Sequence, residues 1–220
     1  MLVLAIDTST PDLVTGLVDT STGQVHDRVL PGTRAHNEQL TPAVRALLAD
    51  AAVDFTDLDA VVVGCGPGPF TGLRVGMATA AAFGDALGIP VHGVCSLDAI
   101  ARRLPDARRL VATDARRREI YWATYEGETR TAGPDVVKPA ELTLPHEVTV
   151  ISVPAHLAEQ LPEGLRGVDK QDLSPDAASL VAVADLEAVP DPLVPLYLRR
   201  PDAKEPKPVP KSPAIPEVEL

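Results

Sequence analysis

The stretch from Asp59 to Gly88 constrains the fold more than any other part of the chain. An apolar run, Ala60-Val61-Val62-Val63-Gly64, leads into Cys65-Gly66-Pro67-Gly68-Pro69-Phe70-Thr71-Gly72 and then into an alanine-rich segment at 73–87. A short β-branched run bounded by Gly and Pro predicts a buried strand, and a long alanine-rich run predicts a helix. Gly88 and Pro90 supply the helix stop. The stretch therefore predicts a strand, a rigid turn and a helix.

The glycine-rich turn resembles a phosphate-binding loop only superficially. Pro67 and Pro69 remove two backbone N–H groups that would bind an anion, and no Lys-Ser or Lys-Thr pair occupies the P-loop position. Arg74, in the first turn of the helix, is the one residue here that could still meet a carboxylate or phosphate. We interpret the loop as a structural turn.

The predicted helix carries small residues at every fourth position: Gly72, Gly76, Ala80 and Gly84. Such a ridge lets another backbone approach closely, as in membrane helix pairs. The helix contains charged residues and is shorter than the roughly 20 apolar residues that a membrane span needs. We expect no membrane span and a tight contact with a neighbouring element.

The order of elements predicts the fold class. Strands are expected at 2–6, 13–18, 25–30, 60–64 and 91–94, and helices are expected near 40–51, at 73–87 and from Ser96, as the cap, to 104. This order is typical of a ribonuclease-H-like unit. A weaker round follows, with strands at 110–114, 120–125 and 148–153 and a helix at 174–186. The prediction is α/β with an actin-like (ribonuclease-H-like) fold, two repeats with the second one reduced.

These repeats define the expected domains. Residues 1–104 form the first lobe, which binds the partner, and residues 105–200 form a smaller second lobe. Residues 201–220 are rich in Pro, Lys and Glu and bury nothing, so a disordered tail is expected.

Composition excludes several functional classes. The net charge is −11 and only 3% of residues are aromatic, so a dedicated nucleic-acid surface is not expected. The exception is an arginine-rich stretch, Arg102–Arg118, which could be a solvated face or an RNA-facing patch. Cys65 and Cys95 lack metal spacing and fit reduced thiols. The first residues lack the basic region of a signal peptide, so a cytoplasmic location is expected.

Several motifs resemble one known family, TsaB (YeaZ). They are Ile6-Asp7-Thr8-Ser9-Thr10, His36-Asn37-Glu38-Gln39-Leu40, the segment from Gly66 to Gly76, Ser96-Leu97, Asp114–Tyr121 and Tyr197-Leu198-Arg199. The resemblance covers most of residues 1–125 and a short piece near 197. Pro69 stands where the family usually has Ser.

The resemblance implies a scaffold subunit in the synthesis of threonylcarbamoyladenosine beside the tRNA anticodon. Its partners would be a TsaD-like catalytic paralogue and a TsaE-like ATPase, with a homodimer when the chain is alone and tRNA bound only through the complex. In the catalytic paralogue, two histidines four apart help bind a metal. This chain keeps His36 but has Leu40 at the second position. We therefore expect no catalytic residue, no metal and no cofactor.

The expected partner surface combines the small-residue ridge with a helical stripe. It comprises Leu40, Val44, Leu47, Leu48, Gly72, Leu73, Gly76, Ala80, Phe83 and Gly84. Asp7 and Arg74 are the candidates for an anion or nucleotide contact. Two alternatives remain open: an independent actin-like ATPase or small-molecule kinase, and a self-associating chaperone-like dimer. Ser9, Ser96 and Cys95 lack an identifiable His and acid, so a hydrolase triad has no support.

Overall fold

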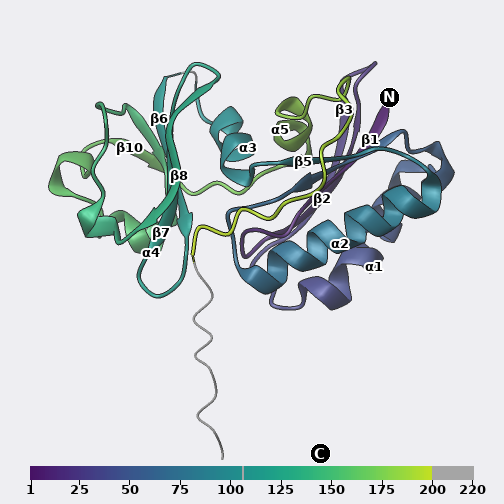
Figure 1. The fold of residues 1–220 in the computed structure, drawn as a ribbon, viewed down its shortest axis with the longest axis horizontal. Helices are drawn as coiled ribbons and strands as arrows, with labels where there is room; N and C mark the ends of the chain where they lie inside the picture. The colour runs from purple at the N-terminus through teal and green to yellow at the C-terminus, as the bar shows by residue number, and fades with distance from the viewer. Residues whose placement is uncertain (106, 200–220) are drawn as a thin grey trace, which may run out of the picture.

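The computed structural model describes residues 1–105 and 107–199, which form two lobes side by side (Figure 1). The first lobe follows the predicted order of elements. It contains β1 (Leu2–Asp7), β2 (Leu13–Asp19), β3 (Gln24–Leu30), α1 (His36–Ala51), the 3-10 helix η1 (Phe55–Asp57), β4 (Ala60–Gly64), α2 (Phe70–Leu87), β5 (Val91–Val94) and α3 (Ser96–Arg103). The expected tail, 201–220, lies outside the described residues. None of the described helices is long and apolar enough to cross a membrane.

The first sheet has the strand order β3-β2-β1-β4-β5, with β1 antiparallel to β2 and parallel to β4. Successive β1 residues point to opposite faces. Leu4 and Ile6 pack beneath α1 and α2, whereas Val3 and Ala5 pack on the other face. Both faces are thus covered, which explains why β1 and β4 are apolar without alternation.

The second lobe repeats the same topology with fewer and shorter elements. It contains β6 (Arg108–Asp114), β7 (Ile120–Glu126), β8 (Thr129–Val137), η2 (Pro139–Glu141), β9 (Val150–Ser152), α4 (Ala155–Ala158), η3 (Glu163–Leu165), β10 (Asp169–Gln171) and α5 (Ala177–Ala182). Its sheet order, β10-β9-β6-β7-β8, mirrors that of the first sheet. A 3-10 turn stands where the first lobe has α1. The prediction of an actin-like fold with a reduced second repeat is confirmed.

Some elements differ from the prediction. Strands β8 and β10 were not expected, because β8 is largely exposed and β10 is only three residues long. Helix α5 is capped by Asp176 and ends at Ala182, shorter than the expected 174–186. Ser96 is the first residue of α3 and not its cap, because its hydroxyl bonds Asp7 instead.

The last helix of each lobe packs on the sheet of the other lobe. Leu97 and Ile100 of α3 lie in a cluster with Val111 and Tyr121 of the second sheet. On α5, Ala177, Leu180 and Val181 join the first-sheet cluster of β1, β2 and β4. Helices α3 and α5 also contact each other. The proposed boundary at residue 104 therefore follows chain order, whereas packing crosses it.

The expected ridge on α2 is buried inside the monomer. A Cβ built on Gly76 would overlap the Thr8 hydroxyl, and one on Gly72 would lie 2.6 Å from the Thr8 carbonyl oxygen. Gly84 is similarly close to the Val91 side chain, and Ala80 is fully buried. The small residues let α2 approach β1 and β5, so this ridge is not the surface offered to a partner.

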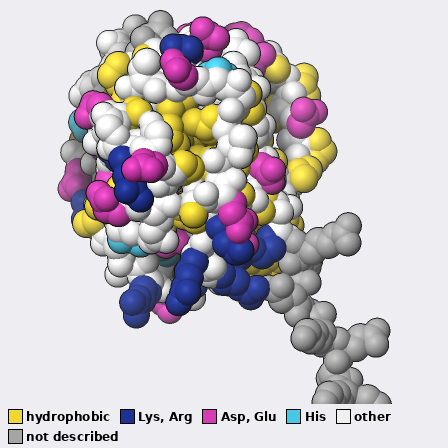
Figure 2. Space-filling model, turned by 90° about the vertical axis from the view of Figure 1, so that its left-hand side faces the viewer, with side chains coloured by type: hydrophobic (Ala, Val, Ile, Leu, Met, Phe, Trp, Pro, Cys, Tyr) yellow, Lys and Arg dark blue, Asp and Glu magenta, His cyan; other side chains and the backbone are white. Residues whose placement is uncertain are grey.

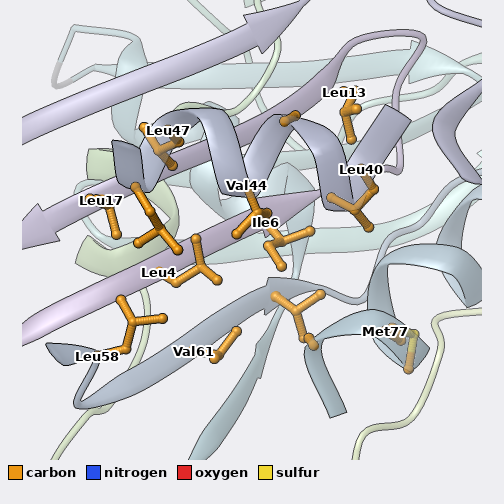
Figure 3. Packing of buried hydrophobic residues seen from close by; sticks show 14 of the residues in the cluster. Leu4, Ile6, Leu13, Leu17, Leu40, Val44, Leu47, Leu58, Val61 and Met77 are labelled. Carbon is orange, nitrogen blue, oxygen red and sulfur yellow. The ribbon is translucent and has the colours of Figure 1, made fainter. Parts of the chain in front are cut away.

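The stripe on α1 is also internal. Leu40, Val44, Leu47 and Leu48 are at most 3% exposed and join the core beneath the first sheet. Figure 3 shows the α1 side chains directed toward Leu4 and Ile6 of β1. Leu73 belongs to the same core, and Phe83 is partly buried against it. The error arose because an apolar stripe shows which face is covered and not what covers it.

The buried ridge yields a stability prediction. Gly76→Leu is expected to lower the free energy of unfolding by about 3 kcal/mol or more, because the larger side chain must displace Thr8 and β1. Ala78→Leu, on the exposed face of the same helix, is expected to change it by less than about 0.5 kcal/mol. Thermal unfolding followed by circular dichroism compares the two variants. Equal stability of both would contradict the packing described here.

Candidate functional site

An open cleft of about 1120 Å³ lies between the two lobes. The first lobe contributes the β1–β2 turn, the β3–α1 loop and the start of α2. The second lobe contributes the β6–β7 loop, and residues 197–199 complete the lining. Ligand sites occur preferentially at domain interfaces, so the residues around this cleft decide what it can bind.

Asp7, at the end of β1, is fully buried behind this cleft. Its Oδ1 accepts hydrogen bonds from the Ser9 backbone N–H at 2.8 Å and the Ser9 hydroxyl at 2.7 Å. Its Oδ2 accepts one from the Ser96 hydroxyl at 2.5 Å. Burial raises the pKa of Asp7 above its ordinary value, although these hydrogen bonds act in the opposite direction.

The expectation that Asp7 contacts an anion or nucleotide is corrected by this geometry. Its carboxylate has no exposed surface, and both oxygens are used by the chain itself. A Cβ built on Gly64 would overlap the carboxylate, so the neighbouring strand packs directly against it. Asp7 is a structural residue that joins the end of β1 to the start of α3.

Arg74 lies in an exposed stack with two aromatic rings. Its guanidinium carbon is 3.7 Å from the centre of the Phe70 ring, and its Nε donates to the Tyr197 hydroxyl at 2.9 Å. The Phe70 and Tyr197 rings stack with centres 5.1 Å apart. The two rings line the cleft, whereas Arg74 holds them from outside it. Its predicted contact with an anion stays a prediction.

Asp114 ends β6 as Asp7 ends β1, but it is partly exposed. Its Oδ1 accepts from the backbone N–H of Arg116 at 2.6 Å, and its Oδ2 lies 3.3 Å from His156 Nε2. The loop that follows is unusual, since Arg116, Arg117 and Arg118 all have positive φ, at 60°, 56° and 64°. Consecutive non-glycine residues rarely adopt this left-handed conformation.

At the second histidine position of the metal-binding pair, this chain has Leu40, which belongs to the hydrophobic core. His36 lines the cleft, and its buried Nε2 has no hydrogen-bond partner among the described residues. Leu40, four residues on, is only 1% exposed and packs under the sheet. Across residues 1–105 and 107–199, no group of three or more His, Cys, Asp and Glu residues is placed to share a metal ion.

The nucleophile candidates are held in unreactive surroundings. The Ser9 and Ser96 hydroxyls both donate to Asp7. Burial raises the pKa of Cys65 to about 11 and that of Cys95 to about 12, so both stay as thiols near neutral pH. The geometry gives a hydrolase triad no support.

The arginine stretch is divided by the fold into structural and exposed parts. Arg102 and Arg103 pair with Glu128 and Asp176, and Arg109 is buried with its guanidinium donating to carbonyl oxygens. Of this stretch, Arg116 and Arg117 line the cleft. Arg34 and Arg199, far away in the chain, join them there. Sequence reasoning did not single out Arg34, because nothing local in 31–35 indicates that it faces the second lobe.

Comparison with known proteins identifies the relationships of the chain. The family model "TsaD: tRNA N6-adenosine threonylcarbamoyltransferase" matches residues 26–174. Escherichia coli "tRNA threonylcarbamoyladenosine biosynthesis protein TsaB" is 35% identical over 130 residues, covering 57% of this chain and 55% of that protein. YeaZ from Pseudomonas aeruginosa has a solved structure with a TM-score of 0.71 and 29% identity, covering 83% of this chain and 89% of its own.

The chain belongs to the TsaB/YeaZ family. An uncharacterized protein of Mycobacterium tuberculosis is similar over a longer range, being 55% identical over 209 residues, with 92% of this chain and 93% of that protein covered. The segment shared with E. coli TsaB spans about half of each protein. Relationship to the TsaB/YeaZ family, expected from the motifs, is thus confirmed.

Asp7 yields a pH prediction. The folded protein binds a proton at Asp7 more readily than the unfolded chain does, because burial raises the pKa of this carboxyl above its ordinary value of 3.8. Stability from this group therefore falls as the pH rises from about 3.8 to the folded pKa and is level above it.

In Asp7→Asn the amide oxygen can accept from Ser9 and the amide nitrogen can donate to the Ser96 hydroxyl. We expect the variant to stay folded and to gain stability relative to the native protein as the pH rises above 4. Urea unfolding between pH 4 and pH 8 measures the difference, with the conservative Asp12→Asn as a control. A variant that becomes progressively less stable than the native protein over this range would contradict the assignment.

Proposed function

We propose that the chain is a non-catalytic scaffold subunit of the cytoplasmic complex that forms threonylcarbamoyladenosine in tRNA. In this proposal it pairs with a TsaD-like catalytic paralogue, and a TsaE-like ATPase joins them. The TsaB/YeaZ membership supports the pathway, since the E. coli and Bacillus subtilis relatives are named for threonylcarbamoyladenosine biosynthesis.

The burial of Asp7 is the observation that carries the non-catalytic part of the proposal. A carboxylate that holds a magnesium nucleotide must offer its oxygens to the cleft. Here those oxygens accept hydrogen bonds from Ser9 and Ser96, and a glycine at position 64 leaves just enough room for them. The strand-end carboxylate has become part of the internal framework.

The partner surface is assigned to the outer faces of α1 and α2 in place of their buried stripes. The two helices lie side by side on one face of the first sheet (Figure 1). Ala78 and Ala82 are exposed on α2, and Thr41 and Arg45 are exposed on α1. Small side chains on α2 allow the close approach of a partner helix. The same surface would serve a homodimer when the partner is absent.

An independent ATPase or small-molecule kinase is the second candidate, because the cleft is large enough for a nucleotide. Isothermal titration calorimetry with ATP and Mg²⁺ separates the two. The scaffold proposal expects no binding tighter than roughly 10 μM, about −7 kcal/mol. Tighter binding accompanied by hydrolysis would favour the enzyme.

The partner surface is tested by charge placed on α2. Ala82→Glu is expected to weaken association with the TsaD-like partner by at least tenfold, because the charge loses water at the interface. Ala188→Glu adds the same charge at an exposed site away from α1 and α2, and it is expected to bind normally. Co-purification and size-exclusion chromatography of mixed proteins measure the complex. An intact complex with Ala82→Glu would place the interface elsewhere.

A further inference from the structure

The interlobe cleft is basic although the protein is acidic. Four arginines line it, Arg34, Arg116, Arg117 and Arg199, against a single carboxylate, that of Asp114, among the described lining residues. The whole chain has a net charge of −11, so this concentration of arginine does not follow from composition. A positive cleft in a negative protein attracts anions to one place.

The arginines come from segments that only the fold brings together. Arg34 lies in the loop before α1, and Arg116 lies in the β6–β7 loop of the other lobe. Arg199 lies in the segment that follows α5. Arg199 is held by Glu119 and by the Ala115 carbonyl oxygen. Figure 2 shows Lys and Arg side chains gathered along the lower edge of the face that the second lobe presents.

Two of these arginines are available to a ligand. The side chains of Arg34 and Arg116 are exposed and have no ion-pair or hydrogen-bond partner within residues 1–105 and 107–199. The loop that carries Arg116 is closed by backbone hydrogen bonds between Ala115 and Glu119, 3.0 Å, and between Glu119 and Arg116, 3.0 Å. These bonds hold the left-handed turn in place.

A stacking surface lies on the same cleft. Phe70 is 49% exposed and Tyr197 is 41% exposed, and both line the cleft as a stacked pair. Arg74 fixes this pair from the other side. Fixed, half-exposed aromatic rings next to arginines suit a nucleobase with its phosphate, because every base offers a ring face for stacking.

We propose that the mouth of the cleft binds an RNA strand, with Arg34 and Arg116 on phosphates and the Phe70–Tyr197 pair against a base. The choice of tRNA as the natural RNA rests on the proposed function. A free nucleotide deep in the cleft fits less well, because Pro11 and Pro69, which both line it, offer no backbone N–H to a phosphate. The exposed arginines lie at the mouth, where a strand crosses both lobes.

The test measures binding of a fluorescently labelled tRNA anticodon stem-loop to the isolated chain by anisotropy, between 50 and 200 mM salt. Arg34→Gln combined with Arg116→Gln is expected to bind about tenfold more weakly at 50 mM. The slope of log K against log salt should fall by about 1.4 to 1.8, since each phosphate contact contributes roughly 0.7 to 0.9. The matched control, Lys138→Gln with Arg166→Gln, removes the same charge from exposed sites outside the cleft lining and should change binding by less than twofold.

Three results would overturn the proposal: no binding at 50 mM salt, an equal loss in both double variants, or stoichiometric displacement of the RNA by millimolar ATP, which would indicate a nucleotide site. Arg34→Gln alone, outside the left-handed loop, should weaken binding about threefold and serves if the double variant is poorly folded by circular dichroism. This proposal departs from the expectation that tRNA is bound only through the complex, because it has the isolated chain bind RNA without the TsaD-like partner. Failure here is therefore distinct from failure of the co-purification that tests the proposed function.

Discussion

The exchange of α3 and α5 between the lobes is the constraint on which the rest of the structure depends. Each sheet has two apolar faces, and the second repeat is too reduced to cover both of its own. Leu97 and Ile100 of α3 supply that cover, each contributing about 1.5–3 kcal/mol by burial. Polar contacts hold the exchange in place, since Arg109 donates to the carbonyl oxygen of Ala101 near the end of α3 and Arg103 pairs with the α5 cap, Asp176. The lobes cannot separate without exposing this core, so the cleft between them has a fixed base.

Asp7 lies at the end of β1 behind the cleft, yet its carboxylate is used in hydrogen bonds within the protein. Its hydrogen bond from Ser96 connects the first strand to the helix that crosses to the other lobe. A buried carboxylate is costly unless its oxygens are hydrogen-bonded, and here three donors serve them. Removing Ser96 would leave Oδ2 without its donor, which costs more than the bond itself contributes. The cost of leaving a buried carboxylate without its donors therefore favours a structural role for Asp7.

The sequence predicted those parts of the fold that depend on local pattern. The strand, turn and helix at 60–87 follow from β-branched residues, prolines and alanines, and the repeated strand-end aspartates indicated the duplication. Strand β8 was missed because its exposed residues show no apolar alternation. The Gly76 ridge was assigned to a partner because periodicity reveals a close contact and not its identity. The candidate site was less predictable still, since Arg34 and Arg116 meet only through the packing of the two lobes.

The cleft and the outer faces of α1 and α2 adjoin each other. Helices α1 and α2 both begin at the cleft, where His36, Asn37 and Phe70 belong to its lining, and both expose their outer faces farther along. A protein bound along the full length of these outer faces would reach the cleft at the helix starts. An RNA held by such a partner would then pass the basic cleft lined by Arg34, Arg116, Arg117 and Arg199. Negative charge elsewhere on the surface would repel an RNA that comes within the screening length, which is about 8–10 Å at physiological salt. The contrast between an acidic surface and a basic cleft would thus guide an RNA to one place on the protein.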